Sequence, residues 1–210
     1  MDTLGTQRSV EVDRPPLLIS IEVAKSLRQV LATIRSRLGM DVAFVSEFLG
    51  SNRIFHAVDS LAPVPGLAAG AMLPMAAGYC RDVVAGILPQ LIPDTSKVPL
   101  AQEIEETQTI PIGAHLSVPI ETADGRIFGT FCCFSHRAMP ELGVADLQLV
   151  QTFSSLVAVQ LSEEVRRICL QASRAAAEQA LTADGRPLTL AELLKATPQP
   201  DQIRSPGQRR

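Results

Sequence analysis

The fold is decided by residues 112–135, which read IGAHLSVPIETADGRIFGTFCCFS. Two β-rich runs flank the turn Asp124-Gly125, so the stretch predicts an antiparallel hairpin. If the connecting loop has two or four residues, pairing sorts the side chains onto the two faces of the sheet. The mixed face would carry His115, Ser117, Thr130, Cys132 and Phe134, and the apolar face Leu116, Val118, Ile120, Phe131 and Cys133. Such a sheet packs on helices with its apolar face and lines a cavity with the other.

A helix and a second hairpin are predicted upstream of this stretch. In residues 20–38 apolar side chains recur at steps of three and four, the period of an amphipathic helix, and Gly39 supplies a helix stop. Residues 41–49 and 53–58 are β-rich, and the turn-rich linker 50–52 between them has the length of a hairpin connection.

The segment between the two hairpins is expected to cover the cavity. Residues 61–80 are apolar but interrupted by prolines and glycines, so they predict a loop over a pocket rather than a membrane span. Residues 77–85 can form a short helix and residues 90–93 a short strand. Residues 100–107 predict a surface helix with a solvated acidic face, formed by Glu103, Glu105 and Glu106.

A long helix is predicted from residue 144 to about residue 181. At 1.5 Å per residue it would be roughly 55 Å long, whereas a domain of about 150 residues is nearer 35–40 Å across, so its end must overhang or bend. Beyond Glu163 its apolar stripe continues, through Val165, Ile168, Cys169 and Ala172. We expect a second copy of this helix to cover them in a parallel homodimer. The alternative is a short helix at 190–194 that folds back.

The domain organisation follows from these elements. We expect a flexible tail at residues 1–17 and one domain at residues 18–163. A helical extension follows at 164–181, and then a mostly disordered tail with one short helix at 182–210. The first residues lack the apolar run of a secretion signal.

Composition argues against several classes of partner and chemistry. Aromatic residues make up 4% and the net charge is −3, so neither a nucleic acid nor a membrane is an expected partner. The four cysteines show neither a disulfide framework nor zinc-ligand spacing, which favours free thiols in the cytoplasm. We expect no metal site, and catalytic motifs such as Gly-x-Ser-x-Gly and His-Glu-x-x-His are absent from the sequence.

Three ordered stretches of the sequence resemble GAF domains. Residues 40–60, MDVAFVSEFLGSNRIFHAVDS, resemble the opening hairpin of bacterial GAF domains. Residues 73–99, LPMAAGYCRDVVAGILPQLIPDTSKVP, resemble the short helix and central strand that follow. Residues 112–135 resemble the closing hairpin, in which Val-Pro is followed by Asp-Gly-x-x-x-Gly-Thr-x-Cys.

This resemblance implies an α/β protein of the α+β type, with an antiparallel sheet between helical layers and a long C-terminal helix. It places a pocket on the sheet face turned away from the first and last helices. The resemblance also implies a signalling context, because similar bacterial domains often precede a cyclic-di-GMP phosphodiesterase domain or another signalling output. Here no Glu-Ala-Leu motif follows Gln179, so a signal would pass through the long helix or to a separate output protein.

The candidate ligand-binding residues are those expected at this pocket: Cys80, Asp94, Thr95, His115, Ser117, Thr130 and Cys132. Cys80 would begin a short helix beside Arg81, where a helix N-terminus and a cation lower a thiol pKa. A lone histidine on a strand is more often a hydrogen-bonded core residue than a metal ligand, which is our expectation for His115. His56 and His136 lie near strand ends and are expected to be exposed.

The leading hypothesis is a sensor module without enzymatic activity, in which an unspecified small molecule binds the pocket and shifts the long helix. One alternative is a dimerisation or docking scaffold with a vestigial pocket. The other is a small thiol redox enzyme that uses Cys80, such as a free methionine sulfoxide reductase. GAF domains that resemble such reductases have three cysteines in the pocket, a pattern that this sequence lacks. GAF domains that resemble bilin-binding relatives have a Cys-His pair in the pocket helix, whereas here Cys80 is followed by Arg81.

Overall fold

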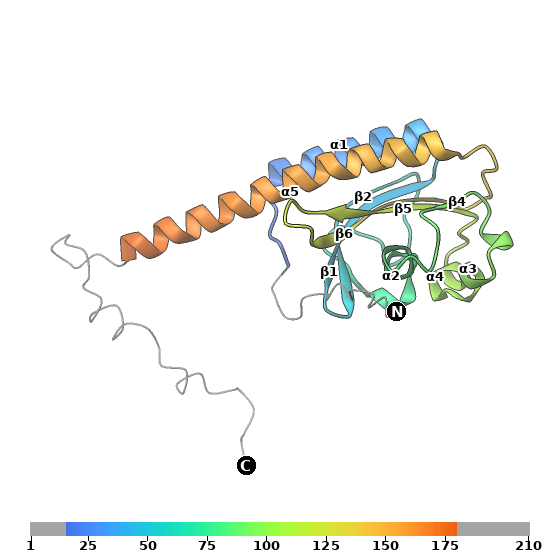
Figure 1. Cartoon of the computed structure of the whole chain (residues 1–210), viewed down its shortest axis with the longest axis horizontal. Helices are drawn as coiled ribbons and strands as arrows, with labels where there is room; N and C mark the ends of the chain where they lie inside the picture. The colour runs from blue at the N-terminus through green and yellow to red at the C-terminus, as the bar shows by residue number, and fades with distance from the viewer. Residues whose placement is uncertain (1–15, 180–210) are drawn as a thin grey trace, which may run out of the picture. The chain divides into compact units, whose positions relative to one another are not determined.

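One six-stranded antiparallel sheet forms the middle layer of the computed structural model, which describes residues 16–179 (Figure 1). Its strand order is β3-β2-β1-β6-β5-β4, and every neighbouring pair is antiparallel. The strands are β1 (Val42–Leu49), β2 (Asn52–Ser60), β3 (Met72–Pro74), β4 (Leu91–Ile92), β5 (Ala114–Glu121) and β6 (Ile127–Ser135). The expected α+β architecture, with a sheet between helical layers, is therefore confirmed.

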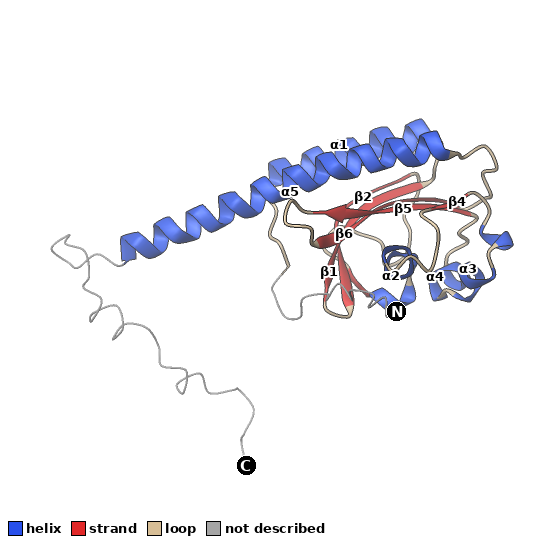
Figure 2. Cartoon of the chain, in the orientation of Figure 1, coloured by secondary structure: helices blue, strands red, loops and turns tan. Residues whose placement is uncertain are grey.

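Two helices, α1 (Ile21–Leu38) and the part of α5 (Val144–Gln179) up to Val165, lie side by side over one face of this sheet (Figure 2). The Ser20 hydroxyl caps α1 by accepting a hydrogen bond from the backbone of Val23, and Gly39 ends the helix in the left-handed conformation, with φ of 66°. One core cluster fills the space between helices and sheet. It includes Leu27, Leu31 and Ile34 of α1, Val150, Val157 and Leu161 of α5, and Leu116, Val118 and Phe131 of the sheet.

Short helices and loops cover the opposite face of the sheet. They include α2 (Tyr79–Val84), α3 (Pro99–Glu103) and α4 (Glu105–Thr109), with two 3-10 turns, η1 (Met75–Ala77) and η2 (Thr95–Lys97). The prediction of a single surface helix at residues 100–107 is wrong. The backbone of Ile104 is extended and its side chain is buried, so the segment breaks into α3 and α4 at this residue.

The closing hairpin has the two faces that alternation predicts. His115 pairs with Phe134, and Ser117 pairs with Cys132, on the face turned away from α1 and α5. The connecting loop has five residues, 122–126, rather than two or four. A bulge between Ile120 and Glu121 adds the extra residue that keeps the expected parity.

A second bulge reverses the alternation along β2. Val45 pairs with Ala57, but the next residue, Ser46, pairs with Phe55, so His56 is the extra residue. His56 is therefore turned to the helix-covered side, where its Nε2 lies 2.7 Å from Glu47 Oε2 and its ring stacks on Phe128. The expected exposure of His56 is wrong, whereas His136 is exposed as expected.

Part of the loop expected at residues 61–80 forms a strand. Residues Met72–Pro74 make up β3, which pairs with the start of β2 and extends the sheet at that edge. Three residues with a proline give too short a pattern for β-propensity to identify.

The helix α5 is continuous from Val144 to Gln179, and contacts divide the chain into two units between Val165 and Arg166. Within the described residues, its segment Val144–Ala175 is the one helix long and apolar enough to cross a membrane, judged by length and composition. Inside the first unit the same helix supplies buried residues to the core. The tails expected at the chain ends and the short helix at 190–194 lie outside the described residues.

Candidate functional site

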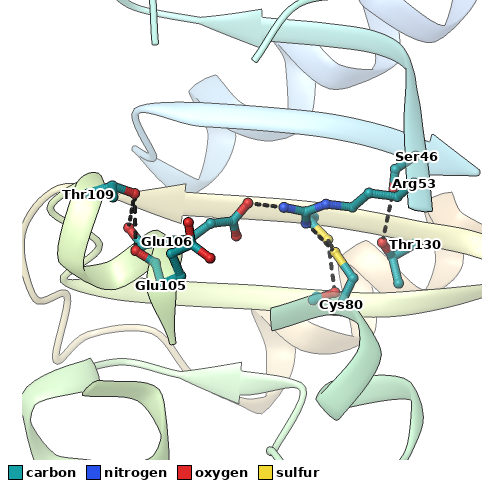
Figure 3. A network of polar contacts seen from close by, with 9 residues as sticks. Ser46, Arg53, Cys80, Glu105, Glu106, Thr109 and Thr130 are labelled. Atoms are coloured by element: carbon teal, nitrogen blue, oxygen red, sulfur yellow. Dashed lines mark hydrogen bonds and ion pairs between the residues drawn. The ribbon is translucent and has the colours of Figure 1, made fainter. Parts of the chain in front are cut away.

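Arg53 is the centre of the polar site on the sheet face covered by α2, α3 and α4. Its side chain is completely buried, because the bulge at His56 turns Arg53 and Phe55 to this face. Its Nη1 donates to Cys80 Sγ at 3.0 Å, and its Nη2 forms an ion pair with Glu106 (Figure 3). The guanidinium also lies 5.3 Å from the centre of the Phe55 ring, where a cation is attracted by the ring face.

Glu106 provides the negative charge that a buried guanidinium requires. It lies on α4 and is only partly exposed, whereas Glu103 and Glu105 are exposed. The prediction that all three acidic side chains face the solvent is therefore wrong for Glu106. The ion pair lies against Gly78, where a Cβ atom would come within 2.4 Å of both Arg53 Nη2 and Glu106 Oε2, so a larger residue here would force the two paired side chains to shift.

Cys80 and Cys132 form a buried thiol pair beside Arg53. Their Sγ atoms are 3.5 Å apart, and Ser117 Oγ lies 2.9 Å from Cys132 Sγ. The hydrogen bond with Cys132 and, against the opposing effect of burial, the charge of Arg53 hold the pKa of Cys80 well below its usual range. Burial and the neighbouring Cys80 raise the pKa of Cys132.

The cation beside Cys80 is therefore not the one expected from the sequence. Arg81 is exposed and its Nε donates to Asp82 Oδ1 at 2.8 Å, so it points away from the thiol. The cation beside the Cys80 thiol is instead Arg53, which lies on β2, 27 residues earlier in the chain.

His115 completes the site from β5. Its ring stacks on Tyr79 with centroids 4.1 Å apart, and burial with the nearby charge of Arg53 lowers its pKa to about 3, so the ring is neutral near pH 7. The Tyr79 hydroxyl lies 2.6 Å from Thr107 Oγ1, and Thr107 in turn donates to the carbonyl of Ala101. These bonds fasten α4 to α2.

The structure brings together five of the seven predicted site residues. Cys80, Ser117, Cys132, Thr130 and His115 all lie buried on this face, and Thr130 Oγ1 is 3.0 Å from Ser46 Oγ.

The other two predicted residues lie apart from this cluster. Asp94 caps the 3-10 turn η2, with Oδ1 accepting from Ser96 Oγ at 2.6 Å, and Thr95 donates to the Ile112 carbonyl at 2.5 Å. Both bonds hold a turn rather than line the site.

The cavity expected at these residues is closed in the structure. The side chains of the site are packed against each other and against an aromatic and aliphatic cluster that includes Phe44, Phe55 and Tyr79. Hollows lie elsewhere: one of about 340 Å³ is bounded by Leu91, Asp94 and Pro140, and one of about 190 Å³ lies between β5 and α5.

Two buried polar atoms of the site have no hydrogen-bond partner within the described part of the chain. They are Arg53 Nε and His115 Nδ1. Nearly all buried polar atoms in native proteins are hydrogen-bonded, and an unsatisfied one costs about 1–3 kcal/mol. Either atom can form a hydrogen bond with a ligand only when the packed side chains around it move apart. In the described ranges no three His, Cys, Asp or Glu side chains are grouped to hold a metal ion.

Sequence reasoning missed Arg53, Tyr79 and Glu106. The one available signal for Arg53 is an arginine inside a β-rich run, and the bulge that turns it inward has no sequence mark. Glu106 is hidden in a cluster of three acids, of which only one contacts the site.

The chain matches the family model described as the GAF domain over residues 22–161. A comparison with curated proteins gave no match.

Solved structures with this fold are distant in sequence. The blue-light absorbing form of the Thermosynechococcus elongatus PixJ GAF-domain aligns with a TM-score of 0.57 at 15% identity, over 77% of this chain and 95% of that one. The chromophore-binding domain of the bacteriophytochrome RpBphP3 from R. palustris aligns with a TM-score of 0.55 at 15% identity, over 69% and 57%. A type II free methionine-R-sulfoxide reductase from Thermoplasma acidophilum aligns at 0.54 and 11% identity, over 68% and 94%. At these identities the likeness shows the fold alone.

Proposed function

The chain belongs to the GAF domain family, and from this premise we propose that it is a non-enzymatic sensor module that binds a small molecule at the Arg53 site. One observation carries the proposal: buried polar groups from four strands and α2 converge there, and Arg53 Nε and His115 Nδ1 have no hydrogen-bond partner among residues 16–179. A purely structural face would satisfy or omit such atoms, because each costs stability. The RpBphP3 domain of this fold is named for binding a chromophore, which supports a ligand at this kind of domain.

A bound ligand would act on the helical layer through the sheet. Cys132 and Ser117 lie on the site face of β6 and β5, while their neighbours Cys133 and Leu116 pack in the core beneath α1 and α5. Because protein interiors are closely packed, a change in these strands is felt by both helices. The continuous helix α5 would pass the signal to a separate output protein in the bacterial cytoplasm.

The sensor function is tested by a thermal-shift screen of the full chain against a library of cytoplasmic metabolites. A ligand present at tenfold its Kd should raise the Tm by about 3–6 °C, since binding to the folded state alone stabilises it. A library that leaves the Tm unchanged throughout would favour the scaffold alternative, in which the closed site is a packed core.

A second candidate function is favoured by the thiol pair. Cys80 has a lowered pKa and a second thiol 3.5 Å away, two features that thiol redox enzymes share, and a solved reductase has this fold. Incubating the chain with free methionine sulfoxide and dithiothreitol, and measuring methionine, tests it. We expect no turnover above that of Cys80→Ser, and turnover that depends on Cys80 would replace the sensor function.

We also propose that the chain forms a homodimer through α5. Past Glu164 this helix carries apolar side chains on one face at Val165, Ile168 and Cys169, and Val165 and Cys169 are exposed. A two-fold axis makes such a stripe complementary to itself and gives two α5 helices that run in parallel.

A further inference from the structure

The guanidinium of Arg53 has one edge that is only half used. Nη2 contacts Glu106, whereas Nε on the same edge has no hydrogen-bond partner within the described residues. The two N–H groups of this edge point in the same direction and match the two oxygens of one carboxylate. Glu106 supplies the required negative charge without completing the two-bond arrangement.

Glu106 is carried by a segment of two short helices, α3 and α4, which buries Ala101 and Ile104 against the sheet. It lies on α4, a helix of five residues, and neither α3 nor α4 has a side-chain N-cap. Helices this short depend on their tertiary contacts. Those contacts include the Tyr79–Thr107 pair and the bond from Gln102 Nε2 to the Thr95 carbonyl at 2.9 Å. Local opening of this segment would expose Arg53 while the sheet stays folded.

Building on the sensor function above, we propose that Glu106 occupies the position of a ligand carboxylate, and that the ligand is a small organic acid. Its carboxylate binds Nε and Nη2 of Arg53 and displaces Glu106 with the α3–α4 segment. The buried charge of Arg53 stays compensated throughout, because one carboxylate replaces another. Displacement of α4 is then the first movement of the sensor.

The surroundings indicate what the rest of the acid is like. Phe44 and Phe55 meet edge to face beside Arg53, and Tyr79 stacks on His115 across the site. These rings favour a flat, apolar body over a highly charged one. Nδ1 of neutral His115, which has no partner in the described part of the chain, offers the ligand one further hydrogen bond.

The test compares acetate and benzoate with their neutral amides, acetamide and benzamide, on the full chain at constant ionic strength. In Glu106→Gln the competing carboxylate is absent, so we expect the acids to bind at least about tenfold more tightly than to the wild-type chain. At tenfold Kd they should raise the Tm of this variant by about 3–6 °C, and the amides should not. Glu105→Gln, which changes the exposed neighbour on the same helix, is the matched control and should behave like wild type.

Hydrogen exchange of the wild-type chain tests the same exchange of carboxylates without any variant. Saturating benzoate should speed amide exchange in residues 99–109, and benzamide should not. If neither acid stabilises Glu106→Gln and neither loosens residues 99–109, the carboxylate inference is overturned. A neutral metabolite found in the thermal-shift screen would also overturn it while leaving the sensor function in place.

Discussion

At the scale of single residues, Arg53 determines what the site can do. A fully buried guanidinium is tolerated only with a compensating charge and hydrogen-bond acceptors. Glu106 gives the charge, Cys80 Sγ accepts a bond at 3.0 Å, and the Phe55 ring faces the cation. This set of partners leaves Nε without a hydrogen-bond partner among the described residues. Burial, with the charge of Arg53 as the smaller cause, lowers the pKa of His115, and the hydrogen bond with Cys132 together with the charge of Arg53 lowers the pKa of Cys80.

The neutral state of His115 predicts a pH dependence of stability. Its pKa in the folded chain, about 3, lies below the 6.5 of a free histidine, so on acidification the unfolded chain binds a proton at this residue that the folded chain does not bind. Stability is therefore lost as the pH falls from about 6.5 towards 3, by up to about 1.4 kcal/mol per pH unit. In urea unfolding between pH 5 and 7, His115→Phe should show a shallower loss than wild type. Equal slopes would show that His115 titrates normally.

At the scale of elements, the pairing of β1 with β6 depends on Gly129. A Cβ atom there would lie 1.8 Å from the Ser46 carbonyl oxygen, so Gly129→Ala must push the two strands apart. We expect a loss of about 3 kcal/mol or more in the free energy of unfolding, measured by urea denaturation, at the upper end of overpacking costs.

Gly125→Ala is the comparison for this strand variant. Gly125 has φ of 78° in the exposed loop of the same hairpin, where alanine is strained but meets no backbone. We expect a cost of about 1–2 kcal/mol. A Gly129→Ala variant as stable as Gly125→Ala would mean that β1 and β6 do not approach as closely as described.

The regular elements could be predicted from the sequence because each has a local signal. Neighbouring residues are enough to indicate the period of α1, its end at Gly39, the alternation along β5 and β6, and the length of α5. The site could be predicted only in part. Alternation places Ser117 and Cys132 on one face of the sheet, and the short helix predicted after the loop brings Cys80 to them, but Arg53 reaches them through a bulge and Glu106 through a helix break. Such irregularities are decided by tertiary packing, which no local pattern reports.

At the scale of the whole molecule, the homodimer is expected to depend on α5 beyond the domain. Sedimentation of the full chain at tens of micromolar should give a dimer, and truncation after Glu164 should give a monomer, because it removes the side chains from Val165 onwards. A full-length monomer would contradict the pairing of helices. A dimer undiminished by truncation would place the interface elsewhere.

Binding of a small molecule at Arg53 is the central claim, and native mass spectrometry of the chain purified from the cells that produce it tests this claim most directly. Wild type should carry a small molecule that Arg53→Met has lost. Arg35→Met is the matched control, since Arg35 also forms an ion pair, with Asp59, but lies on α1. It should keep the molecule. A wild-type chain that is folded and empty, or a molecule retained equally by Arg53→Met, would contradict the account.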